Sequence, residues 1–186
     1  MSNIDRKQFL QALSLITGAS MISPESFALG PELKKAKFKL GLCTYLWGKD
    51  WDVPTLIRNC TDTKIHGVEL RVDHAHKVMP ELSKAERSEV KKKFADSPVV
   101  IVGLGTNQQY DFPDQDKLKA SIERTKEFIK LGADIGGSGV KVKPNALHKE
   151  VPTDKTLEQI GRSLNELAKY AGDFGQQLRL EVHGAE

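Results

Sequence analysis

Hydrophobic segments of two kinds alternate along the chain from residue 37 onward. Short, mostly continuous apolar runs such as 99–104 are typical of strands buried on both faces. Longer segments such as 117–131 carry their apolar residues at helical spacing instead. The pattern predicts strands over 38–47 (with the loop that follows), 68–72, 99–104, 139–143 and 178–182, and helices that begin at 53 and span 82–94, 117–131 and 157–174.

Local signals support the predicted helix boundaries. Pro54 suits the first turn of a helix, because the N–H that proline lacks has no partner there. Ser83, followed three residues later by Glu86, forms a capping-box pattern, and Gly132 supplies a C-terminal stop. Strand and helix alternate without a linker, which indicates one α/β domain over residues 37–186.

Five parallel strands permit two architectures. A doubly wound open sheet is complete at this length, whereas a (β/α)8 TIM barrel has eight strands and about 250 residues. An open sheet usually has a glycine-rich phosphate loop after its first strand, but residues 43–48 contain no such motif. Polar residues instead recur at successive strand ends: Thr44, Glu69 and Arg71, Thr106 and Asn107, Lys143 and Asn145, Glu181 and His183. We therefore predict an α/β fold, a TIM barrel of which about five strands are present in this chain.

The first 30 residues are expected to lie outside this domain. Arg6 and Lys7 are followed by Phe9, a mildly apolar run and small residues around Ala28. This order resembles a weak twin-arginine export signal, with Lys7 where the second arginine stands. We expect an export leader over 1–30 and a periplasmic or exported protein. A short amphipathic helix on a cytoplasmic protein is the alternative.

Composition narrows the classes of partner. The formal net charge of +3 is too small to indicate a nucleic-acid or membrane partner, and no apolar run reaches the roughly 18 residues of a membrane span. Cys43 and Cys60 form no Cys-x-x-Cys pair, so neither a zinc knuckle nor a disulfide scaffold is indicated. His74 and His76 have a spacing compatible with a metal, but no third ligand is near them in the sequence. We expect a small-molecule partner, and a homo-oligomer is left open.

Three motifs in strand order carry a family resemblance. They are GVELRVD at 67–73 with the nearby His76, GVKVK at 139–143, and LEVHG at 180–184. Each motif is short, but the ordered set resembles the xylose isomerase-like TIM barrels. This is the sugar phosphate isomerase/epimerase superfamily, which also contains endonuclease IV. The resemblance extends from about Lys37 to the C-terminus.

The resemblance implies a divalent metal ion (Mn, Mg, Co or Zn) held by two Glu, an Asp and a His at the barrel mouth. The first of those glutamates lies on the fifth strand, where this chain has Glu181. Glu181 is therefore the candidate metal ligand and catalytic base, and its alternative role is a strand-end carboxylate paired with a lysine or arginine. His183, two residues on, shares its face and is a candidate contact for substrate or metal. The other ligands would come from later strands, so we expect the chain to be the front part of a larger enzyme.

Strand alternation places further charged side chains on one face. Glu69 and Arg71 share a face, where they either contact substrate or form an internal ion pair. Lys141 and Lys143 alternate toward the end of their strand, where Lys143 is a candidate contact for a substrate oxygen. Pairing of these lysines with Glu69 or Glu181 is the alternative.

The implied chemistry accounts for these residue types. Isomerising or epimerising a sugar removes a proton next to a carbonyl and leaves an enediolate, whose charge a divalent ion stabilises. A carboxylate takes the proton, and a second acid returns it. The resemblance therefore implies a metal-dependent sugar isomerase or epimerase. A non-catalytic carbohydrate- or partner-binding barrel is left open, as is an endonuclease IV-like phosphodiesterase, which five scattered histidines suit poorly.

Overall fold

The computed structural model describes residues 38–144 and 146–181, and the described residues from Lys39 onward belong to one compact unit. Strands and helices alternate along it: β1 (Gly41–Cys43), α2 (Val53–Asp62), β2 (Gly67–Arg71), α3 (Lys84–Ala95), β3 (Val100–Gly105), α4 (Gln115–Asp134), β4 (Gly139–Val142), α5 (Thr153–Asp173) and β5 (Gln177–Leu180). Each predicted strand and helix from residue 38 onward is present, with ends that differ by a few residues.

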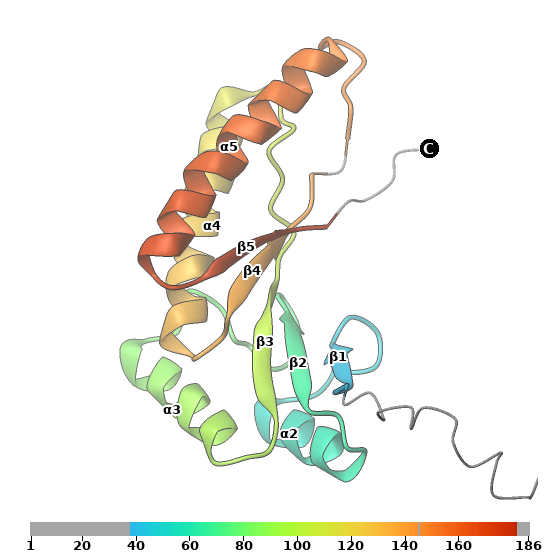
Figure 1. The fold of residues 1–186 in the computed structure, drawn as a ribbon, viewed down its shortest axis with the longest axis vertical. Helices are drawn as coiled ribbons and strands as arrows, with labels where there is room; N and C mark the ends of the chain where they lie inside the picture. The colour runs from blue at the N-terminus through green and yellow to red at the C-terminus, as the bar shows by residue number, and fades with distance from the viewer. Residues whose placement is uncertain (1–37, 145, 182–186) are drawn as a thin grey trace, which may run out of the picture. The chain divides into compact units, whose positions relative to one another are not determined.

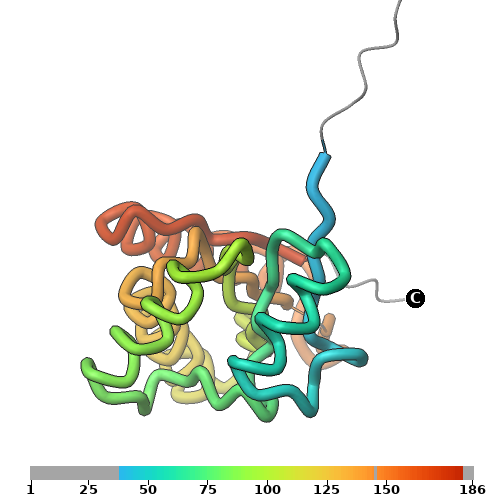
Figure 2. The backbone as a smooth tube through the Cα atoms, turned by 90° about the horizontal axis from the view of Figure 1, so that it is seen from below, coloured from blue at the N-terminus to red at the C-terminus, as the bar shows by residue number. Residues whose placement is uncertain are grey.

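The five strands form one parallel sheet in the order β1-β2-β3-β4-β5. A helix connects each strand to the next, and crossovers of this kind are right-handed. Because the strand order is sequential, all of these crossovers place their helices on the same face, as α4 and α5 lie beside β4 and β5 (Figure 1). Successive units, coloured from teal to red, follow one another in chain order (Figure 2). A doubly wound sheet has helices on both faces, so this order excludes that alternative and confirms the predicted α/β fold class.

Side-chain caps fix where three of the helices begin. The Asp52 carboxylate accepts a hydrogen bond of 2.9 Å from the Thr55 amide at the start of α2. Ser83 and Glu86 form a reciprocal capping box at the start of α3, which confirms that prediction. Asp114 accepts two amide hydrogen bonds at the start of α4. A cap of this kind stabilises a helix by about 1 kcal/mol.

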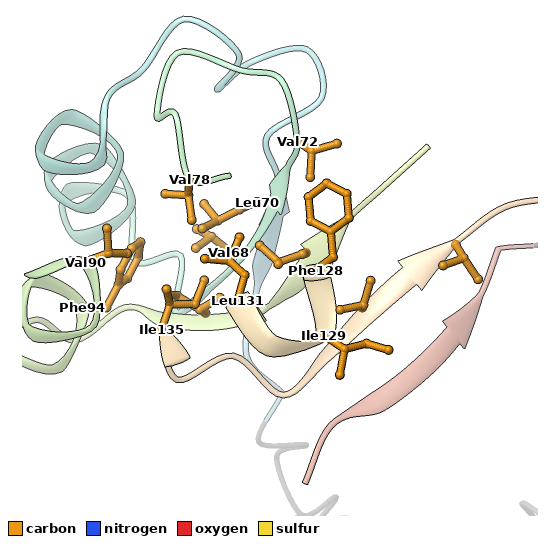
Figure 3. Close-up of a cluster of buried hydrophobic side chains, with 14 of the residues drawn as sticks. Val68, Leu70, Val72, Val78, Val90, Phe94, Phe128, Ile129, Leu131 and Ile135 are labelled. Carbon is orange, nitrogen blue, oxygen red and sulfur yellow. The ribbon is translucent and has the colours of Figure 1, made fainter. Parts of the chain in front are cut away.

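The hydrophobic core lies between the sheet and the helices. Val68 and Leu70 of β2 are fully buried on that side of the sheet. Phe128 and Leu131 of α4 belong to the same buried cluster, and Figure 3 shows α4 lying against the strands with Val90 of α3 to one side. Burying a side chain of this size contributes about 1.5–3 kcal/mol, so this contact fixes α4 on the sheet.

The opposite face of the sheet, here called the inner face, carries no helix from the described residues. Side chains alternate along a strand, so Glu69 lies on the inner face while Val68 and Leu70 face the helices. Two glycines keep the strands close together there. A Cβ atom on Gly103 would lie 2.6 Å from the Gly139 carbonyl oxygen, and one on Gly139 would lie 2.5 Å from the Gln177 carbonyl oxygen.

The predicted leader over 1–30 lies outside the described residues, so export stays a prediction. Among the helices of the described ranges, none combines the length and the apolar character needed to cross a bilayer.

Replacing Gly139 with alanine tests the close approach of β4 and β5. The new methyl group meets backbone rather than a flexible side chain, so we expect G139A to lower the free energy of unfolding by about 1–3 kcal/mol. The control is Gly161 within α5, where a Cβ atom meets nothing within 4 Å, so G161A should raise stability by about 0.5–1 kcal/mol. Urea unfolding measures both, and equal effects of the two substitutions would contradict the packing described here.

Candidate functional site

Charged side chains gather on the inner face toward the carboxyl ends of the strands. Glu69 and Arg71 lie on β2, Lys141 lies on β4, and Glu181 directly follows β5. Because the strands are parallel, their carboxyl ends meet at one edge of the sheet, which is the end where α/β barrels place their chemistry. These four side chains form the candidate site.

The Lys141 ammonium joins the two carboxylates of the site. Its Nζ atom lies 2.8 Å from Glu69 Oε1 and 2.5 Å from Glu181 Oε2. The three side chains are 23%, 20% and 33% exposed for Lys141, Glu69 and Glu181 respectively, so water screens the contacts only in part. Burial lowers the pKa of Lys141, but its hydrogen bonds to Glu181 and Glu69 outweigh burial and raise the pKa above its usual value. Lys141 is therefore charged at neutral pH.

A glycine on β3 lets Lys141 reach across the sheet to Glu69, because β3 lies between the strands that carry them. Gly105 of β3 is paired with Lys141, and a Cβ atom there would lie 2.8 Å from Glu69 Oε1. A one-residue register shift between β2 and β3 pairs Glu69 with Gly103, so Val102 is passed over. The shift thus sets glycines, rather than larger side chains, between the two charges.

Cys43 adds a thiol to the site. Its Sγ atom donates a 3.3 Å hydrogen bond to Glu69 Oε1, the same oxygen that Lys141 contacts. Burial raises the pKa of the Cys43 thiol, and the neighbouring Glu69 carboxylate raises it further. The thiol form therefore predominates at neutral pH, and Cys43 acts here as a hydrogen-bond donor to Glu69.

Arg71 binds β3 rather than Glu69. Its Nη1 atom donates a 2.9 Å hydrogen bond to the Gly105 carbonyl oxygen, and its Nη2 atom donates to the Asn107 side chain. Its guanidinium carbon lies 5.9 Å from the centre of the Tyr45 ring. Glu69 and Arg71 do share a face, since both lie beside Gly105. The ion pair between Glu69 and Arg71, one of the two predicted alternatives, is wrong, whereas the alternative pairing of Lys141 with Glu69 and Glu181 is confirmed.

The predicted contacts of Lys143 and His183 with substrate remain untested, for different reasons. Lys143 is half-buried at the end of β4, where its backbone amide donates a 3.0 Å hydrogen bond to the Gln108 carbonyl oxygen. Its proposed contact with substrate stays a prediction. His183 lies outside the described residues, so its proposed contact with substrate or metal also stays a prediction.

His76 stabilises the loop after β2. One ring nitrogen, Nε2, lies 2.8 Å from the Arg71 carbonyl oxygen, and the other, Nδ1, accepts a 3.0 Å hydrogen bond from the Val78 amide. Burial lowers the pKa of His76, so the ring is neutral at neutral pH. Because both ring nitrogens bind backbone, His76 does not offer one to a metal with His74.

Arg179 of β5 is an inner-face residue that the sequence pattern did not bring forward. Its guanidinium donates hydrogen bonds of 2.8 Å to the Val102 carbonyl oxygen and 2.7 Å to Ser138 Oγ. It lies over Gly103 and Gly139, whose missing side chains leave room for it. Side chains alternate along a strand, and Arg179 stands two residues before Glu181. This spacing is the sequence signal that would have placed both on the same face.

The described residues do not, as they stand, fit a metal site. Glu69 and Glu181 supply the oxygen atoms that divalent ions accept, but the Lys141 ammonium already contacts both. Within 38–144 and 146–181, no group of three or more His, Cys, Asp and Glu side chains is placed to hold a metal ion. What this arrangement offers chemically is a pair of carboxyl groups with one ammonium group between them.

Comparison with known proteins identifies the fold. Residues 57–186 match the family described as xylose isomerase-like TIM barrel. A search of curated proteins finds no match.

Solved structures of barrels resemble the chain over about half of their own length. One is the IolI protein with a bound zinc atom, at a TM-score of 0.67 and 15% identity, with 78% of this chain and 51% of that chain covered. A second is D-psicose 3-epimerase with D-tagatose from Clostridium cellulolyticum H10, at a TM-score of 0.67 and 19% identity, with 78% of this chain and 52% of that chain covered. A third is 3-keto-D-glucoside 4-epimerase from E. coli, at a TM-score of 0.63 and 15% identity, with 77% of this chain and 56% of that chain covered. At these identities the likeness establishes the fold alone.

Alkylation of Cys43 tests the contact between its thiol and Glu69. Only the thiolate reacts with iodoacetamide, so the raised pKa should make Cys43 react several-fold more slowly at pH 8 than an unhindered thiol. E69Q removes the carboxylate charge and should speed the reaction. Peptide mapping by mass spectrometry separates Cys43 from Cys60, which is buried and should not react in the folded protein. An unchanged rate in E69Q would contradict the contact.

Proposed function

Because the chain belongs to the xylose isomerase-like TIM barrel family, we propose that it contributes to a sugar isomerase or epimerase. The reaction would move a proton next to a carbonyl through an enediolate. The observation that carries this proposal is the Glu181 carboxylate, held beside Lys141 at the carboxyl end of β5. Several of the solved structures that share the fold are epimerases of ketoses, which supports the substrate class.

Glu181 is the proposed base. Its carboxylate is two-thirds buried and lies beside the Lys141 ammonium, where it would accept a proton from carbon. The Lys141 ammonium, next to it, would favour the negative charge that develops on the substrate oxygens. Arg71, Glu69 and Lys143 line the same end of the sheet and are the proposed contacts for sugar hydroxyl groups. His183 is a further proposed contact.

A divalent metal remains part of the proposal, with Glu181 as its one candidate ligand in the described ranges. The IolI structure was solved with a bound zinc atom, which supports metal use in the fold. When bound, such an ion would supply a Lewis acid for the substrate carbonyl. The other ligands would have to come from residues outside those described. The predicted export leader favours an unphosphorylated sugar, since sugar phosphates are mainly cytoplasmic.

Solvent-proton exchange into sugars tests the proposed function. The full-length protein, incubated in D2O with a panel of ketoses and aldoses, should introduce deuterium next to the carbonyl and form an epimer or isomer, both visible by NMR. Removing the base with E181Q should lower kcat by about 100-fold or more. The matched control is E166Q, which changes a glutamate paired with Lys126 on the helical surface and should leave kcat unchanged.

Two outcomes would contradict the proposed activity or the proposed role of Glu181. Turnover that survives E181Q would remove Glu181 from the role of base. Sugar binding without any deuterium exchange would favour a non-catalytic carbohydrate-binding barrel, in which Lys141 keeps both carboxylates neutralised.

A further inference from the structure

Two fully buried threonines stand at the carboxyl ends of strands. Thr44 directly follows β1, and Thr106 directly follows β3. A buried hydroxyl group needs hydrogen-bond partners. In each case one partner is the backbone of the neighbouring strand, at a residue that carries a charged side chain of the site.

Thr106 binds the backbone of Lys141 twice. Its amide donates a 3.0 Å hydrogen bond to the Lys141 carbonyl oxygen, and its hydroxyl donates a 2.7 Å hydrogen bond to the same atom. The pairing of β3 with β4 covers only two residue pairs, and Gly105 with Lys141 is the last of them. Thr106 therefore extends a short ladder by one backbone bond and adds a side-chain bond to it.

The peptide group that Thr106 binds is next to the one that holds Glu181. The carbonyl oxygen of Val142, one residue after Lys141, accepts a 2.9 Å hydrogen bond from the Glu181 amide. The Thr106 hydroxyl is itself held in place, because it accepts a 3.3 Å hydrogen bond from the Gln108 amide. Thr106 thus acts on Lys141 directly and on Glu181 through one further peptide group.

Thr44 repeats this arrangement on β2. Its amide donates a 3.1 Å hydrogen bond to the Glu69 carbonyl oxygen, and its hydroxyl accepts a 2.9 Å hydrogen bond from the Arg71 amide. The charged residues of β2 and β4 are thus each held at the backbone by a threonine of the preceding strand.

We propose that Thr106 is a positioning residue: through the Lys141 carbonyl oxygen, its hydroxyl keeps the Lys141 ammonium between Glu69 and Glu181. The inference rests on the proposed function for the catalytic roles of Lys141 and Glu181. The contacts of 2.8 Å and 2.5 Å that Lys141 makes weaken steeply when the donor moves. Loss of the Thr106 hydroxyl therefore loosens both contacts.

The test is the exchange of the Lys141 ammonium protons with water, measured by NMR on the full chain labelled with 15N-lysine. The absence of the signal in K141M assigns it. T106A should raise the exchange rate several-fold, because looser contacts with the carboxylates protect these protons less. T106S keeps the hydroxyl and should retain the wild-type rate. If T106A does not fold by circular dichroism, T106V, which keeps the volume, should show the same increase.

Thr125 of α4 provides a matched control. It is also fully buried, its hydroxyl donates a 2.8 Å hydrogen bond to the Ser121 carbonyl oxygen, and it lies 2.8 Å from the Tyr110 hydroxyl. T125A removes the same atoms as T106A but should leave the exchange of Lys141 unchanged.

The proposal fails if the folded variants without the Thr106 hydroxyl exchange Lys141 protons at the wild-type rate. It also fails if T125A raises the rate equally, because a general loss of stability would then explain the effect. With a sugar that the wild type turns over, T106A should lower kcat several-fold and change KM less, since the Lys141 charge acts in the transition state. The exchange measurement needs no substrate, so faster exchange in T106A together with a wild type that turns over no sugar would keep the positioning of Lys141 and remove the isomerase.

Discussion

The contact of Lys141 with Glu69 and Glu181 is the interaction on which the inner face of the sheet depends. Each carboxylate is at least two-thirds buried, and an unpaired charge in such a place costs several kcal/mol. Lys141 offsets that cost for both at once, and in doing so it links β2, β4 and the end of β5. The carboxyl end of the sheet is thereby charged and paired on its inner face.

Glycines make this arrangement possible. Gly105 lets Lys141 pass over β3 to Glu69, while Gly103 and Gly139 let Arg179 pass from β5 to the backbone of β3. In both cases a long cationic side chain crosses a strand that has no side chain in the way. The helix face shows the opposite solution, with large apolar residues such as Phe128 filling the space. Apolar packing therefore stabilises the helix face, and ion pairs and hydrogen bonds that cross glycines stabilise the inner face.

The strands and helices could be predicted from the sequence, because the patterns that mark them lie within short segments of the chain. Apolar runs and helical spacing located the strands and helices, and Ser83 with Glu86 marked a helix start that the structure confirms. The sequence offered Arg71 and the two lysines of β4 as partners of Glu69 but could not choose between them, because the choice depends on register between strands. An unshifted pairing of β2 with β3 would have set Val102, rather than Gly103, opposite Glu69. The alternation rule placed Glu69 and Arg71 on one face correctly, but it could not tell which cation lies close enough to Glu69 to pair with it.

A double-mutant cycle between Lys141 and Glu181 tests the central claim most directly. Urea unfolding of the wild type, K141M, E181Q and the double variant gives the coupling free energy of the two side chains. Because both side chains are mostly buried and Lys141 Nζ lies 2.5 Å from Glu181 Oε2, we predict a coupling free energy of about 1 kcal/mol or more in favour of the pair. Additive effects of the two substitutions would contradict it, and Lys141 would then be a bystander to the carboxylates of the site.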